Sequence, residues 1–177
     1  MKKIAALLLT VVMCLAAVPS LAAWEVSGGR YWYSWEDGGY AANTWLQDGD
    51  AWYWFDGDGW MATGWKQIGG VWYYFDGSGA MVTGWKQIGG TWYYFSAGGA
   101  MQTGWLQEGS TWYYMYSNGE MATGRVTING STESFGSDGA WKGTVLDDYG
   151  TPLGTETLTE LLIKALRQMI LRLFAFK

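Results

Sequence analysis

The chain has 177 residues, of which 14 are tryptophan, 12 are tyrosine and 27 are glycine. It contains no histidine, which excludes a histidine base, a histidine-dependent catalytic triad and a histidine metal site. The formal net charge of −5 argues against a nucleic-acid-binding surface, and the apolar fraction of 49% argues against intrinsic disorder.

The first 22 residues have the pattern of a secretory signal peptide. Two lysines precede an apolar run over residues 4–18, and residues 20–22, Ser-Leu-Ala, offer a cleavage site of the small-x-small kind. The run is shorter than the roughly 20 residues that a membrane-spanning helix needs. We therefore expect residues 1–22 to be removed on export, together with Cys14, the single cysteine of the chain.

The body of the chain, residues 23–150, repeats with a period of twenty residues. Two series of tryptophans show this spacing: Trp32, Trp52, Trp72, Trp92 and Trp112, and Trp45, Trp65, Trp85 and Trp105. The unit reads T-G-W-K-Q-I-G-G-x-W-Y-Y-F-D-x-x-G-x-M-x and is cleanest in residues 63–82 and 83–102. Such self-similarity predicts an array in which neighbouring units bury each other's apolar surface.

Each unit is predicted to form a β-hairpin. The W-Y-Y-F segment has high β-propensity, and residues 76–79, Asp-Gly-Ser-Gly, have the composition of a turn. Pairing Phe75 with Ala80 across that turn places Tyr74 opposite Met81, on one face of the hairpin. A single hairpin is marginal alone. The predicted fold is therefore all-β, a solenoid of stacked hairpin repeats of about 20 residues each.

The repeat resembles the choline-binding repeat of Gram-positive surface proteins, which is also called the cell-wall-binding repeat. The residues that carry the resemblance are T-G-W, G-x-W-Y-Y-F and the later G-x-M, over roughly residues 29–145. The resemblance implies a non-catalytic module that attaches to choline residues of wall teichoic or lipoteichoic acid. Sibling repeats that bind glucans share the G-W and Y-Y-F segments, so a carbohydrate ligand is the alternative.

The resemblance also implies aromatic cages between consecutive hairpins, with two tryptophans from one repeat and a tyrosine and a methionine from the next. The expected groups are Trp45 and Trp52 with Tyr74 and Met81, Trp65 and Trp72 with Tyr94 and Met101, and Trp85 and Trp92 with Tyr114 and Met121. Which tyrosine of each Trp-Tyr-Tyr segment completes the cage is left open.

Sites at the two ends of the array are left out of the expected set. At the C-terminal end Trp105 and Trp112 would face Ser134 and Trp141, where internal repeats have tyrosine and methionine. At the N-terminal end Trp32 would need a tryptophan at position 25, where the chain has Glu25.

Aromatic cages suit a quaternary ammonium because its nitrogen has no hydrogen to donate, so its charge is best met by ring faces. Each ring contributes about 0.5–2 kcal/mol, and the cost of association leaves a single site with an affinity of about millimolar. Several sites on one polymer would add avidity.

No residue pattern predicts catalysis or a cofactor. No two carboxylates are marked as the acid and base of a glycosidase. The segment 56–59, Asp-Gly-Asp-Gly, lacks the glutamate that a calcium loop needs at its twelfth position, which is Gln67 here. We expect a protein that is not an enzyme and needs no metal or organic cofactor. It is expected to be secreted and to remain at the cell wall or cell surface.

The tail, residues 151–177, loses the repeat pattern. Thr157 and Glu160 have the spacing of a capping box before an apolar run. Apolar residues then recur at helical spacing: Leu158, Leu162, Ala165, Met169, Leu173 and Phe176. This predicts an amphipathic helix of about 20 residues. We expect it to cover the open end of the array, to form a homodimer with a second copy, or, being basic, to contact a membrane surface. In the last case the chain would be a membrane-associated structural protein.

Overall fold

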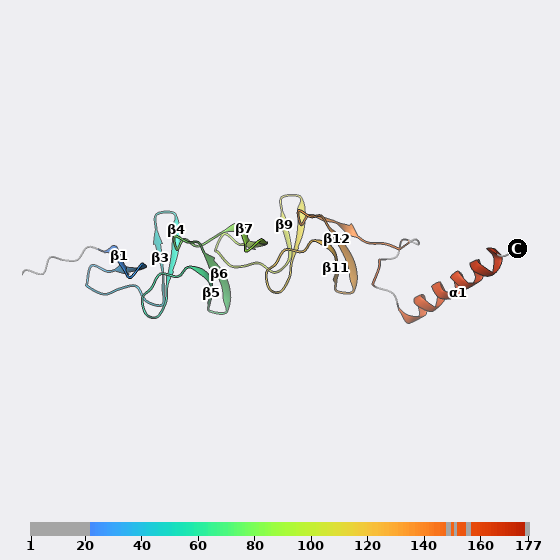
Figure 1. Cartoon of the computed structure of the whole chain (residues 1–177), viewed down its shortest axis with the longest axis horizontal. Helices are drawn as coiled ribbons and strands as arrows, with labels where there is room; N and C mark the ends of the chain where they lie inside the picture. Colours follow the sequence, from blue (N-terminus) through green and yellow to red (C-terminus); the bar gives the residue numbers. More distant parts are fainter. Residues whose placement is uncertain (1–21, 148–149, 151, 155–156, 176–177) are drawn as a thin grey trace, which may run out of the picture. The chain divides into compact units, whose positions relative to one another are not determined.

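The computed structural model of the chain describes residues 22–147, 150, 152–154 and 157–175 (Figure 1). The expected signal peptide, residues 1–22, lies outside the described residues except for Ala22. The chain divides into an N-terminal unit, residues 1–62, and a C-terminal unit, residues 63–177. The expected limits of the repeat region, 23–150, and of the tail, 151–177, stay predictions.

The described part of the chain forms antiparallel strands followed by one helix, as predicted. The N-terminal unit contains β1 (Ala23–Ser27), β2 (Arg30–Ser34), β3 (Thr44–Asp48) and β4 (Ala51–Phe55). The C-terminal unit contains β5 (Gly64–Ile68), β6 (Val71–Phe75), β7 (Gly84–Ile88), β8 (Thr91–Phe95), β9 (Gly104–Glu108), β10 (Thr111–Met115), β11 (Gly124–Ile128), β12 (Ser131–Phe135), β13 (Trp141–Thr144) and α1 (Leu158–Ala175).

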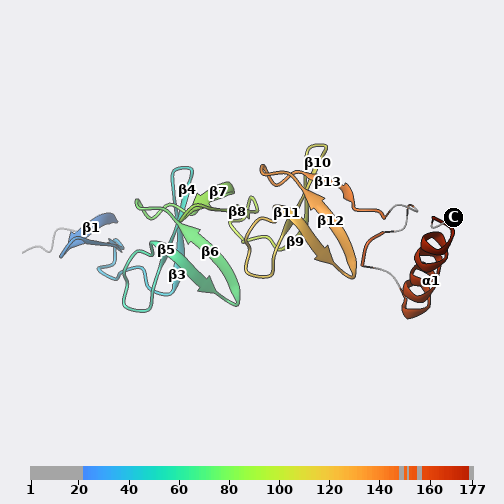
Figure 2. The same ribbon diagram turned by 45° about the vertical axis from the view of Figure 1, so that its right-hand side comes forward.

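Consecutive strands pair as separate two-stranded hairpins, except that β11, β12 and β13 form one three-stranded sheet. Figure 2 shows the paired arrows of β5 with β6 and of β11 with β12. Among the described residues, no sheet extends from one two-stranded hairpin to the next, so side-chain contacts and single hydrogen bonds must join the repeats within each unit. The fold class predicted from the sequence, an all-β hairpin solenoid with a C-terminal helix, is confirmed.

The hairpins form around the two-residue turn before each aromatic strand, which is Gly-Gly in the cleanest repeats, and not around the Asp-x-x-Gly turn. β5 pairs with β6 so that Ile68 faces Val71. Gly69 and Gly70 form the two-residue turn, with φ of +57° and +85°. Positive φ at both central residues is what a tight turn of type I′ requires. The strand that precedes the Trp-Tyr-Tyr segment is therefore its partner.

The predicted pairing across the Asp-Gly-Ser-Gly turn was wrong. Trp65, and not Met81, lies opposite Tyr74. After the turn the chain returns to β6 only through a single bridge between Phe75 and Met81. The turn is closed by a side chain, since Asp76 Oδ1 accepts the backbone N–H groups of residues 78 and 80 at 2.8 and 3.2 Å. It forms a loop that ends the hairpin.

The bulkiest buried side chains of the core occupy the same position in all the described hairpins after the first. These residues are Phe55, Phe75, Phe95, Met115 and Phe135, which are at most 4% exposed. The first hairpin has Ser34 at this position, and its hydroxyl donates to the Ala23 carbonyl at 3.2 Å. Spreading the core over many small clusters is expected for a repeat array, in which each unit packs only on its neighbours.

Hydrogen bonds and a close packing contact join successive repeats of the C-terminal unit. The backbone N–H of Met101, in the loop after β8, donates to the carbonyl of Trp72 on β6 at 2.8 Å. The Met81 side chain lies directly against Gly99, where a Cβ atom would overlap the sulfur. Met101 against Gly119 repeats this contact one repeat later. The last glycine of each of these two turns thus makes room for a methionine from the preceding repeat.

The helix begins at the predicted capping box. The backbone N–H of Glu160 donates to Thr157 Oγ1 at 3.3 Å, and Glu160 Oε2 accepts the Thr157 N–H at 2.7 Å. Lys164 pairs with Asp147, which precedes the helix. Seven apolar side chains of α1 are exposed: Leu158, Leu161, Leu162, Ile163, Leu166, Met169 and Ile170. Among the described residues, no helix combines the length and apolar character that a membrane span requires.

Replacing Gly99 by alanine is expected to lower the free energy of unfolding by about 1–3 kcal/mol, because φ of +78° strains an alanine backbone and the new Cβ would displace Met81. Gly98→Ala in the same turn is the matched control, since a Cβ there meets only the Ser96 hydroxyl, at 3.8 Å. Chemical denaturation measures both. Equal losses for the two variants would contradict the packing role of Gly99.

The stability that Asp76 contributes is expected to disappear in acid. A hydrogen bond from the Ser78 hydroxyl is the main cause that lowers the pKa of Asp76 in the folded chain. A lowered pKa stabilises the fold above the unfolded-state value of about 3.9, and this contribution is lost as the pH falls through the folded-state value. Asp76→Ser copies Ser96 of the next repeat, whose hydroxyl oxygen accepts the Ala100 N–H at 3.2 Å.

Thermal unfolding of both chains between about pH 6 and pH 2.5 measures this contribution. The original chain should lose more of its Tm than the Asp76→Ser variant over that range. Parallel curves would show that the Asp76 carboxylate adds nothing beyond what a hydroxyl provides.

Candidate functional site

Two cavities of the C-terminal unit are lined by corresponding residues of successive repeats. One has a volume of about 310 Å³ and is lined by Trp85, Trp92, Tyr113, Met121 and Asp138. The other has a volume of about 420 Å³ and is lined by Trp65, Trp72, Tyr93, Met101, Ser117 and Asn118. We call them the Trp85 cavity and the Trp65 cavity. In each, two tryptophans come from one hairpin and the other residues from the segments that follow.

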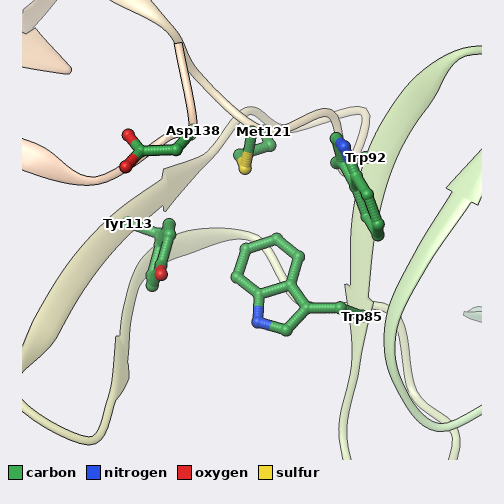
Figure 3. A pocket seen from close by; sticks show the side chains of 5 residues that line it. All are labelled: Trp85, Trp92, Tyr113, Met121 and Asp138. Carbon is green, nitrogen blue, oxygen red and sulfur yellow. The ribbon is translucent and has the colours of Figure 1, made fainter. Parts of the chain in front are cut away.

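In each cavity the ring of the first tryptophan stands at a steep angle to the ring of the second tryptophan and to that of the tyrosine. In the Trp85 cavity the Trp85 ring lies 6.4 Å from Trp92 at 82°, and 4.7 Å from Tyr113 at 64°. In the Trp65 cavity, Trp65 lies 6.3 Å from Trp72 at 85°, and 4.9 Å from Tyr93 at 71°. Figure 3 shows the rings of Trp85, Trp92 and Tyr113 and the sulfur of Met121 around a common space.

The hairpin register explains why both tryptophans reach the same cavity. Trp85 on β7 faces Tyr94 on β8, and Gln87 faces Trp92. Residues at alternate positions of an antiparallel pair share a face, so Trp85 and Trp92 lie on one side of the hairpin. Tyr93 lies on the other side, toward the preceding repeat, where it contacts Trp65.

The structure differs from the expected residue groups at the tyrosine. Tyr93 and Tyr113, the first tyrosines of their segments, line the cavities, whereas the expected groups contain Tyr94 and Tyr114. Tyr94 instead packs beside Trp85 of its own hairpin at 5.1 Å, and its hydroxyl donates to Glu108 Oε1 at 3.0 Å. That hydrogen bond is the first cause that raises the pKa of Tyr94.

The remaining expected residues fall into two sets. The structure brings together Trp65, Trp72 and Met101, and likewise Trp85, Trp92 and Met121. In the N-terminal unit, Trp45 and Trp52 have the same arrangement, at 6.4 Å and 80°. Tyr74 and Met81 belong to the C-terminal unit, where Tyr74 packs beside Trp65. The grouping of these four residues stays a prediction.

The N-terminal unit contains a cluster of aromatic residues around Trp24 that the sequence analysis missed. Trp24 lies 4.8 Å from Tyr53, and the Tyr31 carbonyl accepts the backbone N–H of Met61 at 2.8 Å. The first hairpin is offset from the next by 21 residues, because its bridge joins Ser34 and Tyr40 where the next joins Phe55 and Met61. Trp24 therefore has the position that a period of twenty assigns to Glu25. The turn at Gly28 and Gly29, which lies 21 residues before the turn at Gly49 and Asp50, is the sequence signal that would have found it.

A third cavity, of about 320 Å³, lies within the N-terminal unit and is lined by Ser27, Trp32, Tyr40, Asp58, Gly59 and Trp60. The Arg30 guanidinium lies 4.3 Å from the centre of the Trp60 ring and 3.7 Å from Asp56. A cation of the protein itself therefore already contacts one aromatic wall of this cavity.

The two cavities of the C-terminal unit differ in charge at one position. Asp138 borders the Trp85 cavity, while Asn118, twenty residues earlier, borders the Trp65 cavity. Both side chains are exposed.

Burial is the main cause that raises the pKa of Tyr93, so its ring stays a neutral phenol at physiological pH. The described residues contain no group of three or more His, Cys, Asp or Glu that could hold a metal ion.

Two family models match the repeats. One, described as a choline-binding repeat, matches residues 82–126, which include most of the Trp85 cavity. The other, described as a putative cell wall binding repeat, matches residues 43–61 and 63–81. A search of curated proteins finds no match.

Solved structures of bacterial and phage proteins are similar to the chain. CbpJ from Streptococcus pneumoniae is 38% identical, with a TM-score of 0.67 over 75% of this chain and 48% of that one. Choline binding protein F from Streptococcus pneumoniae is 36% identical, with a TM-score of 0.66 over 75% and 48%. An endolysin from phage Cp-1, complexed with choline, is 28% identical, with a TM-score of 0.51 over 77% and 43%. The chain thus spans about half the length of these proteins.

Proposed function

The chain belongs to the choline-binding repeat family, and on that premise we propose that it is a non-catalytic module that attaches to choline residues of a bacterial cell-wall polymer. The recurring cavity walled by two tryptophans, a tyrosine and a methionine carries this proposal. A solved endolysin that resembles the chain is complexed with choline, and a structure of choline binding protein F was determined with a peptidoglycan analogue.

The geometry of the cavities supports a quaternary ammonium ligand. The ring of Trp85 stands at steep angles to those of Trp92 and Tyr113, so the three rings can surround a positive charge from several sides. Trp72 and Trp92 are 42% and 41% exposed, so the cavities can be reached from solvent. With about 0.5–2 kcal/mol from each ring and the cost of association subtracted, single sites should bind at about millimolar concentrations.

Several weak sites on one chain can together bind a polymer tightly. The Trp65 and Trp85 cavities recur with the twenty-residue period, and a teichoic polymer carries many choline residues along one chain. Once one choline is bound, the next site meets its ligand at a high effective concentration, so the combined affinity exceeds that of either site. This supports a role at the cell wall or cell surface, and export through the predicted signal peptide is part of the same proposal.

The period-related glutamines do not favour the carbohydrate alternative. Sugar binding would need free polar groups around the tryptophans, and glutamines occur at a fixed position of the repeat. The side-chain amides of Gln67 and Gln87 donate to the turn carbonyls of Gly70 and Gly90, at 3.1 and 3.0 Å. One N–H donor of each amide is therefore used within the hairpin.

The first test is a titration of tryptophan fluorescence in the purified chain with choline, and in parallel with a dextran oligomer and with ammonium chloride.

Tyr93→Leu removes one ring face from the Trp65 cavity. It is expected to weaken choline binding there about 2- to 30-fold, which corresponds to the binding free energy that one ring contributes. Tyr93→Phe keeps the ring face and should bind like the original chain. A response to dextran alone would overturn the proposal.

Tyr94→Leu tests the alternative tyrosine. If it removes choline binding at the Trp65 cavity while Tyr93→Leu does not, the second tyrosine completes the cage and the cavity geometry described above is not the binding geometry.

The Trp85 cavity is expected to bind choline more tightly than the Trp65 cavity because Asp138 adds a negative charge at its edge. Exposed charge pairs are worth about 0.2–1 kcal/mol, so Asp138→Asn should weaken that site about 1.4- to 5-fold, and Asn118→Asp should strengthen the other by a similar factor. Calorimetric titrations at about 0.05 and 1 M salt measure the effect, which should fade at high salt. A difference that persists in the neutral isostere 3,3-dimethyl-1-butanol would contradict the role of charge.

A further inference from the structure

We propose that the C-terminal end of the repeat array holds a cation site of a different kind, in which three tryptophans surround a small organic ammonium ion beside a buried carboxylate. The residues are Trp105, Trp112, Trp141 and Glu133. The inference rests on the proposed function only in sharing its aromatic chemistry, and it extends the ligand class to ammonium ions that carry N–H groups.

The three indole rings meet around Trp105. Its ring lies 6.3 Å from Trp112 at 81° and 5.8 Å from Trp141 at 85°. The first contact repeats the pair of Trp85 with Trp92, so the hairpin of β9 and β10 presents the same two walls as the earlier hairpins. Trp141 stands twenty residues after Met121 and supplies an aromatic wall in place of a methionine. All three rings remain 38–41% exposed and are open to a ligand.

Glu133 stands where the other cavities have a tyrosine. It is the third residue of β12, as Tyr113 is of β10, and it follows Tyr113 by twenty residues. The sequence analysis assigned this position to Ser134, which is one residue later. Neighbouring residues of a strand point to opposite faces, so Ser134 lies on the other face of β12. Glu133 is only 7% exposed. A carboxylate thus stands at the strand position where the earlier repeat has a phenol.

The carboxylate is hydrogen-bonded but has no cationic partner among the described residues. Glu133 Oε2 accepts the indole N–H of Trp141 at 2.8 Å, and its two oxygens accept the Thr144 hydroxyl at 3.2 and 3.0 Å. Both donors are neutral. Arg30 pairs instead with Asp56, and Lys164 with Asp147. Glu133 is therefore a largely buried carboxyl group whose hydrogen-bond donors are all neutral.

A bound cation would give the Glu133 carboxyl group a positively charged partner. Charges close together in a partly buried site interact far more strongly than in water. The hydrogen bond fixes the Trp141 ring against the carboxylate, so a cation over the indoles also lies near the negative charge. A full charge attracts a primary ammonium ion as well as a quaternary one, and carboxylate oxygens accept N–H groups, which a phenol ring face cannot do. This site should therefore discriminate less between choline and ethanolammonium than the other cavities do.

The indole N–H resonance of Trp141 reports on the site in the full chain. It is assigned by its loss in Trp141→Phe, and the chain is titrated with choline chloride, ethanolammonium chloride, sodium chloride and 3,3-dimethyl-1-butanol. Both organic cations are expected to shift the resonance saturably, and the other two compounds are not. The indole resonances of Trp85 and Trp92 should respond to choline far more than to ethanolammonium.

Glu133→Gln is the matched variant, because the amide oxygen still accepts the Trp141 N–H while the charge is removed. It should weaken both cations at Trp141 about 3- to 10-fold and leave the Trp85 cavity unchanged. In the original chain, affinity at Trp141 should also fall more steeply with salt than affinity at Trp85, a comparison that needs no variant.

The outcomes separate this inference from the proposed function. A Trp141 resonance that ignores both cations while Trp85 and Trp92 respond to choline would overturn the end site alone. Equal affinities in the original chain and in Glu133→Gln, with equal salt dependence at Trp141 and Trp85, would overturn the role of the carboxylate. If the indole resonances of Trp85 and Trp92 do not shift with choline, the proposed function would be overturned instead.

Discussion

The fold of the C-terminal unit depends on the packing of a tryptophan from one hairpin against the hairpin that follows it. Trp65 lies 4.9 Å from the ring of Tyr93 and 5.7 Å from that of Phe95, which is fully buried. A two-stranded hairpin has only two faces and no interior, so it cannot bury such rings by itself. Stacking supplies the missing cover. The same tryptophan therefore belongs to the core on one side and to a cavity wall on the other.

This double role makes the cavities rigid before any ligand arrives. The Trp65 cavity is bounded by rings held in the core and by Met101, whose backbone donates to the Trp72 carbonyl and whose side chain rests on Gly119. A site built from parts that are already fixed loses little conformational freedom on binding, which favours affinity. It also means that the aromatic composition of the repeat serves stability and recognition together, and neither alone explains why the tryptophans recur.

The ends of the array show which parts of this design are free to change. Ser34 replaces the buried phenylalanine where no earlier described hairpin needs it, and its hydroxyl bonds within the hairpin. At the other end, Glu133 and Trp141 replace tyrosine and methionine, and each finds a hydrogen bond with the other. The backbone and the pair of tryptophans persist at this end while the chemistry at the cavity changes. Terminal units of a repeat array face different neighbours from internal ones, so their residues follow different constraints.

The amino-acid sequence by itself determined the period, the β-structure, the capped helix and the residue types that wall the cavities, because spacing and local propensity are visible without a structure. It did not determine the register. Gly69-Gly70 and the Asp76 to Gly79 segment are both turn signals around one aromatic strand, and local propensity supports a hairpin on either side. Only the packed structure chose the glycine pair, since that pairing puts Trp65 and Trp72 on one face and buries Phe75. Side chains of a strand alternate between faces, so this choice decided that Tyr93 and not Tyr94 lines the cavity, and that Trp24 and Glu133 stand where neighbouring residues were expected.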